Sequence, residues 1–204
     1  DDVDSKIKRL FAEGGENVYG LGATLEGFDV NPFMYEFVFD QAWDYPLTTD
    51  QWILNWAKCR GGNQDEHILK AWDSLHKKIY KKHATAVLMN ARPMLVGTDS
   101  WNTYPDITYN NRDLWDIWTE MLKASHIDNT GYRFDVINVG RQVLGNLFSL
   151  FRDHFTQCYS EKDIDGMKKW ANQMDSLLID TDRLLSCETN FSIGKWIDDA
   201  RSFG

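Results

Sequence analysis

The sequence predicts a mainly α-helical fold preceded by one short strand, and three observations support this prediction. Apolar side chains recur at the three- and four-residue spacing of amphipathic helices along most of the 204 residues. Residues that commonly cap helices stand before several of these segments, and glycine pairs follow some of them. By contrast, a single short run, Asn17-Val18-Tyr19, has the composition of a strand.

The first part of the chain is expected to hold a short helix and then this strand. The predicted helix has one apolar face, formed by Ile7, Leu10 and Phe11. Gly14-Gly15 is expected to end it. Val18, Tyr19 and Leu21 then suit a buried strand. Because one strand cannot form a sheet, we expect it either to pair with chain outside this segment or to be an irregular edge.

Three further helices follow. The helix over 31–43 begins at Asn31, a typical N-cap, followed by a proline in the first turn. Thr48 and Gln51 have the spacing of a capping box, so they predict the start of the next helix, which glycines end. The segment 65–80 is the third helix. Its apolar face carries Ile68, Leu69, Trp72, Leu75 and Ile79.

Helical periodicity is lost over residues 83–109. Long irregular segments in compact domains are commonly functional, and the aromatic content of this one argues against disorder. Helical spacing then returns in segments over about 111–123, 131–159, 164–177 and 190–202. The remainder of the chain is therefore predicted to be all helical.

Composition restricts the classes of partner. The net charge of −9 and the pI near 5.0 argue against nucleic acid and anionic membranes, because both bind cationic surfaces. No apolar run has the length of a membrane span, so no membrane insertion is expected. The three cysteines lie far apart and lack the Cys/His spacing of a zinc site. We therefore expect free thiols, no metal site and no cofactor.

A glutamate between small residues is the main candidate for chemistry. Glu26 lies in the run GLGATLEGFDVNP at 20–32. A carboxylate on a glycine-rich turn between a strand and a helix is typical of catalytic groups in α/β barrels. Together with Tyr35 and Ala42-Trp43, this run resembles the signature of the α-N-acetylglucosaminidases, glycoside hydrolase family 89. In that family the glutamate of the Glu-Gly pair is the catalytic nucleophile, and it corresponds to Glu26.

The resemblance extends along the chain through shorter motifs. These are Ala71-Trp72, Ile79-Tyr80, Arg92-Pro93, Tyr109-Asn110, the stretch from Tyr132 to Gln142 and the run GKWIDDAR at 194–201. It implies that residues 1–30 are the end of a catalytic barrel with the nucleophile loop. It also implies that residues 31–204 are an incomplete all-α C-terminal domain. The expected fold is thus a helical domain preceded by a short strand and loop remnant of a (β/α) barrel.

The resemblance further implies a reaction, the exo-hydrolysis of terminal α-linked N-acetylglucosamine with retention of configuration. Retention requires two carboxyl groups about 5 Å apart, one as nucleophile and one as acid and base. Glu26 is the nucleophile candidate, whereas the acid/base glutamate of the family has no matching motif here. We therefore expect a glycosidase fragment that is inactive alone. Its expected partners are a glycan with terminal α-N-acetylglucosamine and the remaining domains of the parent chain.

Sugar sites combine aromatic ring faces with polar side chains that bind hydroxyl groups. The candidates for substrate binding are Asn31, Trp72, Trp101 and Tyr109. An N-cap role also explains Asn31, and core packing also explains Trp72, which lies on an apolar helix face. Thr108 stands where the family has an aromatic residue, so the pocket is expected to differ there.

Two other functions agree with the same sequence. One is a non-catalytic helical accessory or interaction domain of a carbohydrate-active protein, and the other is a different glycosidase with the same layout. Whether Glu26 faces a pocket separates the enzyme from the accessory domain. For the compartment, the resemblance is compatible with the periplasm or cell surface of a bacterium and with the lysosome. The single glycosylation sequon at Asn190 and the free cysteines favour the bacterial compartments, with the lysosome as the alternative.

Overall fold

The computed structural model describes residues 3–24, 31–43, 48–61, 65–82, 107–124 and 128–203. These residues are almost entirely helical, which confirms the predicted fold class. The longer helices are α1 (Val3–Gly14), α2 (Pro32–Asp40), α3 (Thr49–Gly61), α4 (Glu66–Ser74), α6 (Asn111–Met121), α7 (Thr130–Glu161), α8 (Ile164–Leu185) and α9 (Ile193–Ser202). Short helical turns are η1 (Gly15–Asn17), the π-helix η2 (Leu75–Tyr80) and η3 (Thr189–Phe191).

The chain divides into two compact units, residues 1–56 and 57–204. In the first unit, α2 and the first part of α3 pack through aromatic rings. Phe33 lies edge-on to Trp52, with centroids 5.4 Å apart, and Phe37 does so at 5.0 Å. The indole Nε1 of Trp52 also donates to Asp40 Oδ2 at 2.7 Å. Aromatic packing therefore forms the core of this unit.

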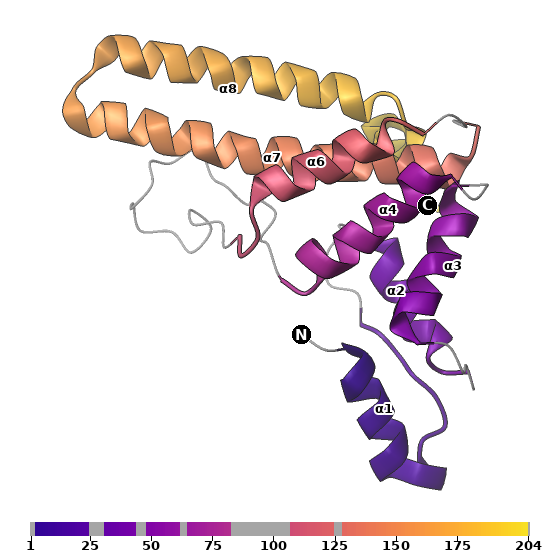
Figure 1. Ribbon diagram of the computed structural model, residues 1–204. Helices are drawn as coiled ribbons and strands as arrows, with labels where there is room; N and C mark the ends of the chain where they lie inside the picture. The colour runs from indigo at the N-terminus through magenta and orange to yellow at the C-terminus, as the bar shows by residue number, and fades with distance from the viewer. Residues whose placement is uncertain are drawn as a thin grey trace. The chain divides into compact units, whose positions relative to one another are not determined.

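The second unit is built around α7, its longest helix (Figure 1). α8 runs back along α7, α6 packs on α7, and α4 packs on α6. Lys162, which has a positive φ of 59°, ends α7, and Asp163 then caps α8. The core contains Ile68, Ala71, Trp72, Leu75, Leu114, Ile117, Met121, Tyr132, Val136, Ile137, Val143 and Leu177.

Local signals in the sequence place most helix starts correctly. Gln51 N donates to Thr48 Oγ1, and Thr48 N donates to Gln51 Oε1, which confirms the predicted capping box. The helix predicted over 65–80 does form, but its second half is π-helical rather than α-helical. The structure extends two later predicted helices, because α7 reaches Glu161 and α8 reaches Leu185.

The strand predicted at 17–19 is wrong for this structure. Residue 17 ends η1, and residues 18–24 have no regular secondary structure. Tyr19, expected in a buried strand, is 97% exposed. A strand needs a partner to satisfy its backbone hydrogen bonds, and no described residue supplies one here.

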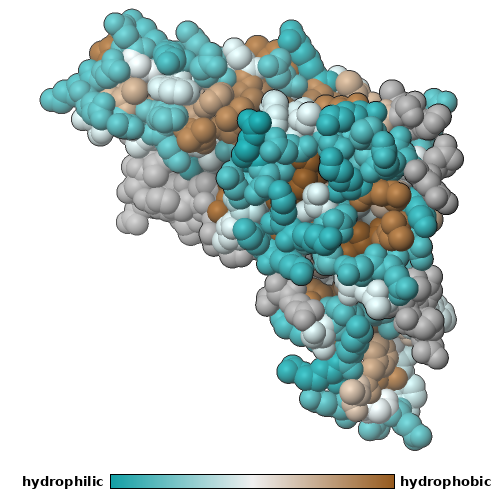
Figure 2. All heavy atoms as spheres, viewed as in Figure 1, coloured by the Kyte–Doolittle hydropathy of each residue, from teal (hydrophilic) through white to brown (hydrophobic). Residues whose placement is uncertain are grey.

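Polar residues cover most of the visible face, with hydrophobic residues gathered in separate patches (Figure 2). Some large apolar side chains stay exposed, and on α9 these are Ile193, Trp196 and Ile197. Among the described helices, none is long and apolar enough to span a membrane.

Candidate functional site

Three of the five predicted site residues fall in the described part of the chain. Glu26 and Trp101 lie outside the described residues. Asn31 belongs to the first unit, and Trp72 and Tyr109 belong to the second. The structure therefore gives the surroundings of three candidates for sugar binding, and the nucleophile role of Glu26 stays a prediction.

Asn31 is the N-cap of α2. Its backbone is extended, with φ −92° and ψ 106°, and its side-chain Oδ1 accepts a hydrogen bond from Phe33 N at 3.1 Å. Pro32 occupies the first turn, where a missing N–H has no cost. The local sequence thus sets the direction of the Asn31 side chain, with its oxygen turned toward the helix.

Trp72 lies on α4 and is only 4% exposed. Its ring is parallel to that of Tyr80, with an interplanar angle of 2° and centroids 6.4 Å apart. Tyr80 is the last residue of the π-helix η2, a kind of segment that is frequent at functional sites. Trp72 is therefore part of the core, whereas Tyr80 keeps partial exposure.

Tyr109 lies just before α6 and is 9% exposed. Its hydroxyl accepts a hydrogen bond from Asn146 Nδ2 at 3.0 Å. Asn146, on α7, also donates to Asn111 Oδ1 at 3.0 Å, and it accepts from Gln142 Nε2 at 2.8 Å. Asn111 Nδ2 in turn donates to the Val143 carbonyl at 3.2 Å. The start of α6 is thereby joined to the middle of α7 by a buried polar cluster.

This Tyr109 cluster contains functional candidates that the sequence analysis missed. Asn146 is 5% exposed, and Gln142 lies one turn before it on the same helix. Two amides at i and i+4 on one face of a predicted helix were the available signal, because buried amides require partners. Tyr109 was the only member of the cluster predicted from the sequence as a site residue.

Hydrogen bonding and burial have opposite effects on the pKa of the Tyr109 hydroxyl. Burial raises the pKa of its hydroxyl, while hydrogen bonds from the Asn146 and Gln142 side chains lower it. Burial is the larger effect, so the net pKa is above its ordinary value of 10.0. Tyr109 therefore keeps its proton at neutral pH and can bind a ligand through a neutral hydroxyl.

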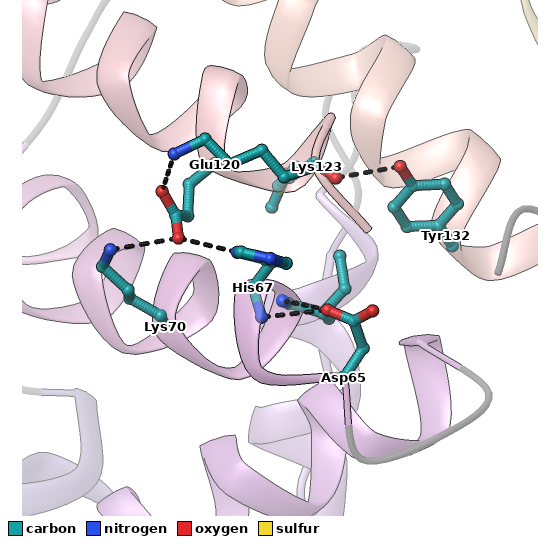
Figure 3. Close-up of polar contacts among 8 residues, drawn as sticks. Asp65, His67, Lys70, Glu120, Lys123 and Tyr132 are labelled. Atoms are coloured by element: carbon teal, nitrogen blue, oxygen red, sulfur yellow. Dashed lines mark hydrogen bonds and ion pairs between the residues drawn. The ribbon is translucent and has the colours of Figure 1, made fainter. Parts of the chain in front are cut away.

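A second polar cluster joins α4 to α6 (Figure 3). Glu120 Oε1 lies 3.0 Å from both His67 Nδ1 and Lys70 Nζ, and its Oε2 lies 2.8 Å from Lys123 Nζ. These hydrogen bonds, with that of His67 the largest cause, lower the pKa of Glu120 to about 2. A carboxylate held ionised by three donors is a structural anchor rather than a proton donor.

The clusters differ in the chemistry they offer. The Tyr109 cluster presents amides and a hydroxyl, which are the groups that bind sugar hydroxyls. In the Glu120 cluster, by contrast, the carboxylate is already paired with side chains of the same cluster.

Comparisons with known proteins agree with this description. A family model described as the α-N-acetylglucosaminidase (NAGLU) C-terminal domain matches residues 52–204. The human protein named α-N-acetylglucosaminidase is 25% identical over 199 residues, which cover 95% of this chain and 26% of the human protein. The chain thus spans about a quarter of the length of this curated relative.

Proposed function

The chain belongs to the family of α-N-acetylglucosaminidase C-terminal domains, and on this premise we propose that it is part of a retaining exo-glycosidase. The proposed substrate is a glycan that ends in α-linked N-acetylglucosamine. The alignment with the human enzyme over 95% of the chain carries the proposal, since so long a match extends beyond the helical domain toward the Glu26 motif. The resemblance to glycoside hydrolase family 89 supplies the retaining mechanism.

In the proposed mechanism, Glu26 attacks the anomeric carbon and forms a glycosyl-enzyme. A second carboxyl group, from the full-length protein outside these residues, protonates the leaving oxygen and then activates water. Glu26 must be ionised to attack, so we expect hydrogen-bond donors around it. The chain alone is therefore expected to be inactive.

The substrate-binding residues of this proposal are Asn31, Trp72, Trp101 and Tyr109. Tyr109 has the strongest support, because its hydroxyl belongs to a buried cluster of amides. Trp72 has the weakest support, because its ring is buried against Tyr80. The division into a barrel end at 1–30 and a helical domain at 31–204 is part of the same proposal.

The proposed partners are the glycan substrate and the remaining domains of the parent protein. The proposed compartment is the periplasm or cell surface of a bacterium, with the lysosome as the alternative. Both follow from the resemblance rather than from a contact in the structure.

A second candidate is a non-catalytic accessory domain of a carbohydrate-active protein. One observation favours it, because the matching family model describes a C-terminal domain and starts at residue 52, after Glu26. The two candidates differ in one respect, which is whether Glu26 takes part in the reaction.

The test is the hydrolysis of an aryl α-N-acetylglucosaminide by the full-length protein and by its Glu26→Ala variant, with and without azide. Removing a nucleophile should lower kcat by orders of magnitude, and azide should restore turnover as a glycosyl azide. Glu36→Ala is the matched control, since Glu36 is an exposed glutamate on α2.

The two candidates give different results. Loss of activity in Glu26→Ala alone, with azide rescue, supports the glycosidase. Activity that survives in Glu26→Ala would show that another residue is the nucleophile, and a full-length protein without any activity on this substrate would favour the accessory domain.

A further inference from the structure

We propose that Tyr109 donates its hydroxyl proton to an acceptor oxygen of the bound sugar, and that Asn146 is the positioning residue that fixes this polarity. The inference rests on the proposed glycosidase function. It goes beyond that function because it states which direction one hydrogen bond runs, and which side chain decides it.

The orientation of the Asn111 side-chain amide follows from its contact with a backbone carbonyl. Asn111 lies with one end of its amide 3.2 Å from the Val143 carbonyl oxygen. A carbonyl oxygen can only accept, so the nitrogen of Asn111 must face it. The Asn111 oxygen must then face the other way, toward Asn146. The hydrogen-bond partners of the Asn111 amide therefore determine its orientation.

The orientation of Asn111 determines the orientation of the Asn146 side-chain amide. The group that faces Asn111 Oδ1 at 3.0 Å must be the Asn146 nitrogen, because two oxygens would repel each other. The same nitrogen lies 3.0 Å from the Tyr109 hydroxyl, so its two N–H groups are both used. The Asn146 oxygen accepts from Gln142 Nε2 at 2.8 Å. Reversing Asn146 would set its oxygen against Asn111 Oδ1 and its nitrogen against Gln142 Nε2, so it would break both of these contacts.

The orientation of Asn146 in turn determines where the hydroxyl proton of Tyr109 can point. Since Tyr109 accepts from Asn146, its own proton must point to a different acceptor. Within the described part of the chain, no residue accepts that proton. A buried donor without a partner is unfavourable, and Tyr109 is only 9% exposed. A ligand oxygen would complete the hydrogen bonding, and a sugar offers several.

Tyr132 provides a matched control within the same unit. It is 6% exposed, and its hydroxyl donates to the Met121 carbonyl at 2.9 Å. The Tyr132 proton is therefore already satisfied inside the core. The two tyrosines have similar burial and differ in whether the protein itself uses the proton.

The test uses the full-length protein and a set of aryl α-N-acetylglucosaminides in which one sugar hydroxyl at a time is replaced by hydrogen. Wild type, Tyr109→Phe, Asn146→Asp and Tyr132→Phe are compared by kcat, KM and thermal midpoint. Asp at 146 offers only acceptor oxygens when ionised, so it would turn the Tyr109 proton inward. Each variant is a near-isosteric change, so its fold can be checked by the midpoint.

We expect Tyr109→Phe and Asn146→Asp to lower kcat/KM about tenfold, the effect of one neutral hydrogen bond. Wild type should lose a similar factor on one deoxy substrate, and both variants should no longer distinguish that substrate from its parent. Tyr132→Phe should lower the thermal midpoint and keep the full distinction. A residue with a purely structural role would not remove the dependence on one sugar oxygen.

The inference is overturned if wild type is active while Tyr109→Phe keeps the wild-type kcat/KM and the wild-type response to every deoxy sugar. In that case water or the protein accepts the proton, and the proposed function still stands. If the wild type itself has no activity on the parent glycoside, the proposed function fails, and this inference fails with it. The wild-type assay thus separates the two failures.

Discussion

Arg60, at the end of α3, and Asp135, in the first turns of α7, form a bidentate salt bridge. Arg60 Nε lies 2.9 Å from Asp135 Oδ2, and Nη2 lies 2.6 Å from Oδ1. Burial raises the pKa of Asp135, and the hydrogen bonds and charge of Arg60 oppose this rise. The guanidinium also lies 5.8 Å from the centre of the Phe134 ring. Two positions 75 residues apart in the chain are thus held together.

Arg60→Ala is expected to lower the free energy of unfolding by about 3–5 kcal/mol, because the buried Asp135 carboxylate loses its partner. Urea unfolding of the chain measures this loss. Arg60→Lys should recover only part of it, since an ammonium cannot make the two parallel bonds of a guanidinium.

Arg112→Ala is the matched control for this prediction. Arg112 pairs with Asp116 at 3.0 Å, but both side chains are largely exposed, so this loss should be at most about 1 kcal/mol. Equal effects of Arg60→Ala and Arg112→Ala would contradict a special role for the buried pair.

Glu120 should make the stability of the fold depend on pH. Its folded pKa of about 2 lies below its ordinary value of 4.5, so the ionised carboxylate favours the folded state. This contribution is fully present above the unfolded pKa and is lost as the pH falls from 4.5 toward 2. Urea midpoints across this range should fall in the wild type, and less steeply in Glu120→Gln.

Equal slopes in wild type and Glu120→Gln would exclude Glu120 as the source. Asp113→Asn is a suitable comparison, because Asp113 makes a single ion pair with Lys78, at 2.8 Å, on an exposed surface. That variant should keep nearly the whole wild-type slope.

Gly140 lies where side chains of α6 and α8 pack closely against the backbone of α7. A Cβ at this position would lie 2.6 Å from Trp118 Cζ2 on α6 and 2.9 Å from Leu184 Cδ2 on α8. Gly140→Ala is therefore expected to lower the free energy of unfolding by about 1–3 kcal/mol, because the Trp118 ring and the Leu184 methyl group must move. Thermal unfolding measures the change.

Gly194→Ala provides the opposite expectation. The nearest atom to its added Cβ, Ser192 Oγ, is 3.6 Å away, an ordinary contact, and alanine favours a helix over glycine by about 1 kcal/mol. This variant should be neutral or more stable. A destabilisation equal to that of Gly140→Ala would show that close packing is not the cause.

The sequence predicted what depends on near neighbours. The Thr48–Gln51 capping box and the Asn31 cap involve residues within three positions, so spacing alone specifies them. The Arg60–Asp135 pair and the Tyr109–Asn146 bond join distant positions, which periodicity does not encode. The predicted strand failed for the same reason, since a strand depends on a partner elsewhere in the chain.

Burial also limited the prediction of binding residues. An aromatic on a helix face has the same pattern whether it packs in a core or contacts a sugar, and Trp72 proved to be buried. By contrast, the polar neighbours of Tyr109 become visible only when α6 and α7 are brought together.

Asn31 allows its capping role to be separated from its proposed role in sugar binding. Asn31→Ala removes the oxygen that accepts from Phe33 N, so it should cost about 0.5–2 kcal/mol of stability. Asn31→Asp keeps a capping oxygen and should be as stable as wild type, but it loses the amide N–H donors. If those donors bind the sugar, Asn31→Asp should raise KM in the full-length protein at an unchanged thermal midpoint. Wild-type kinetics in Asn31→Asp, with a lowered midpoint in Asn31→Ala, would mean that Asn31 acts as a helix cap alone.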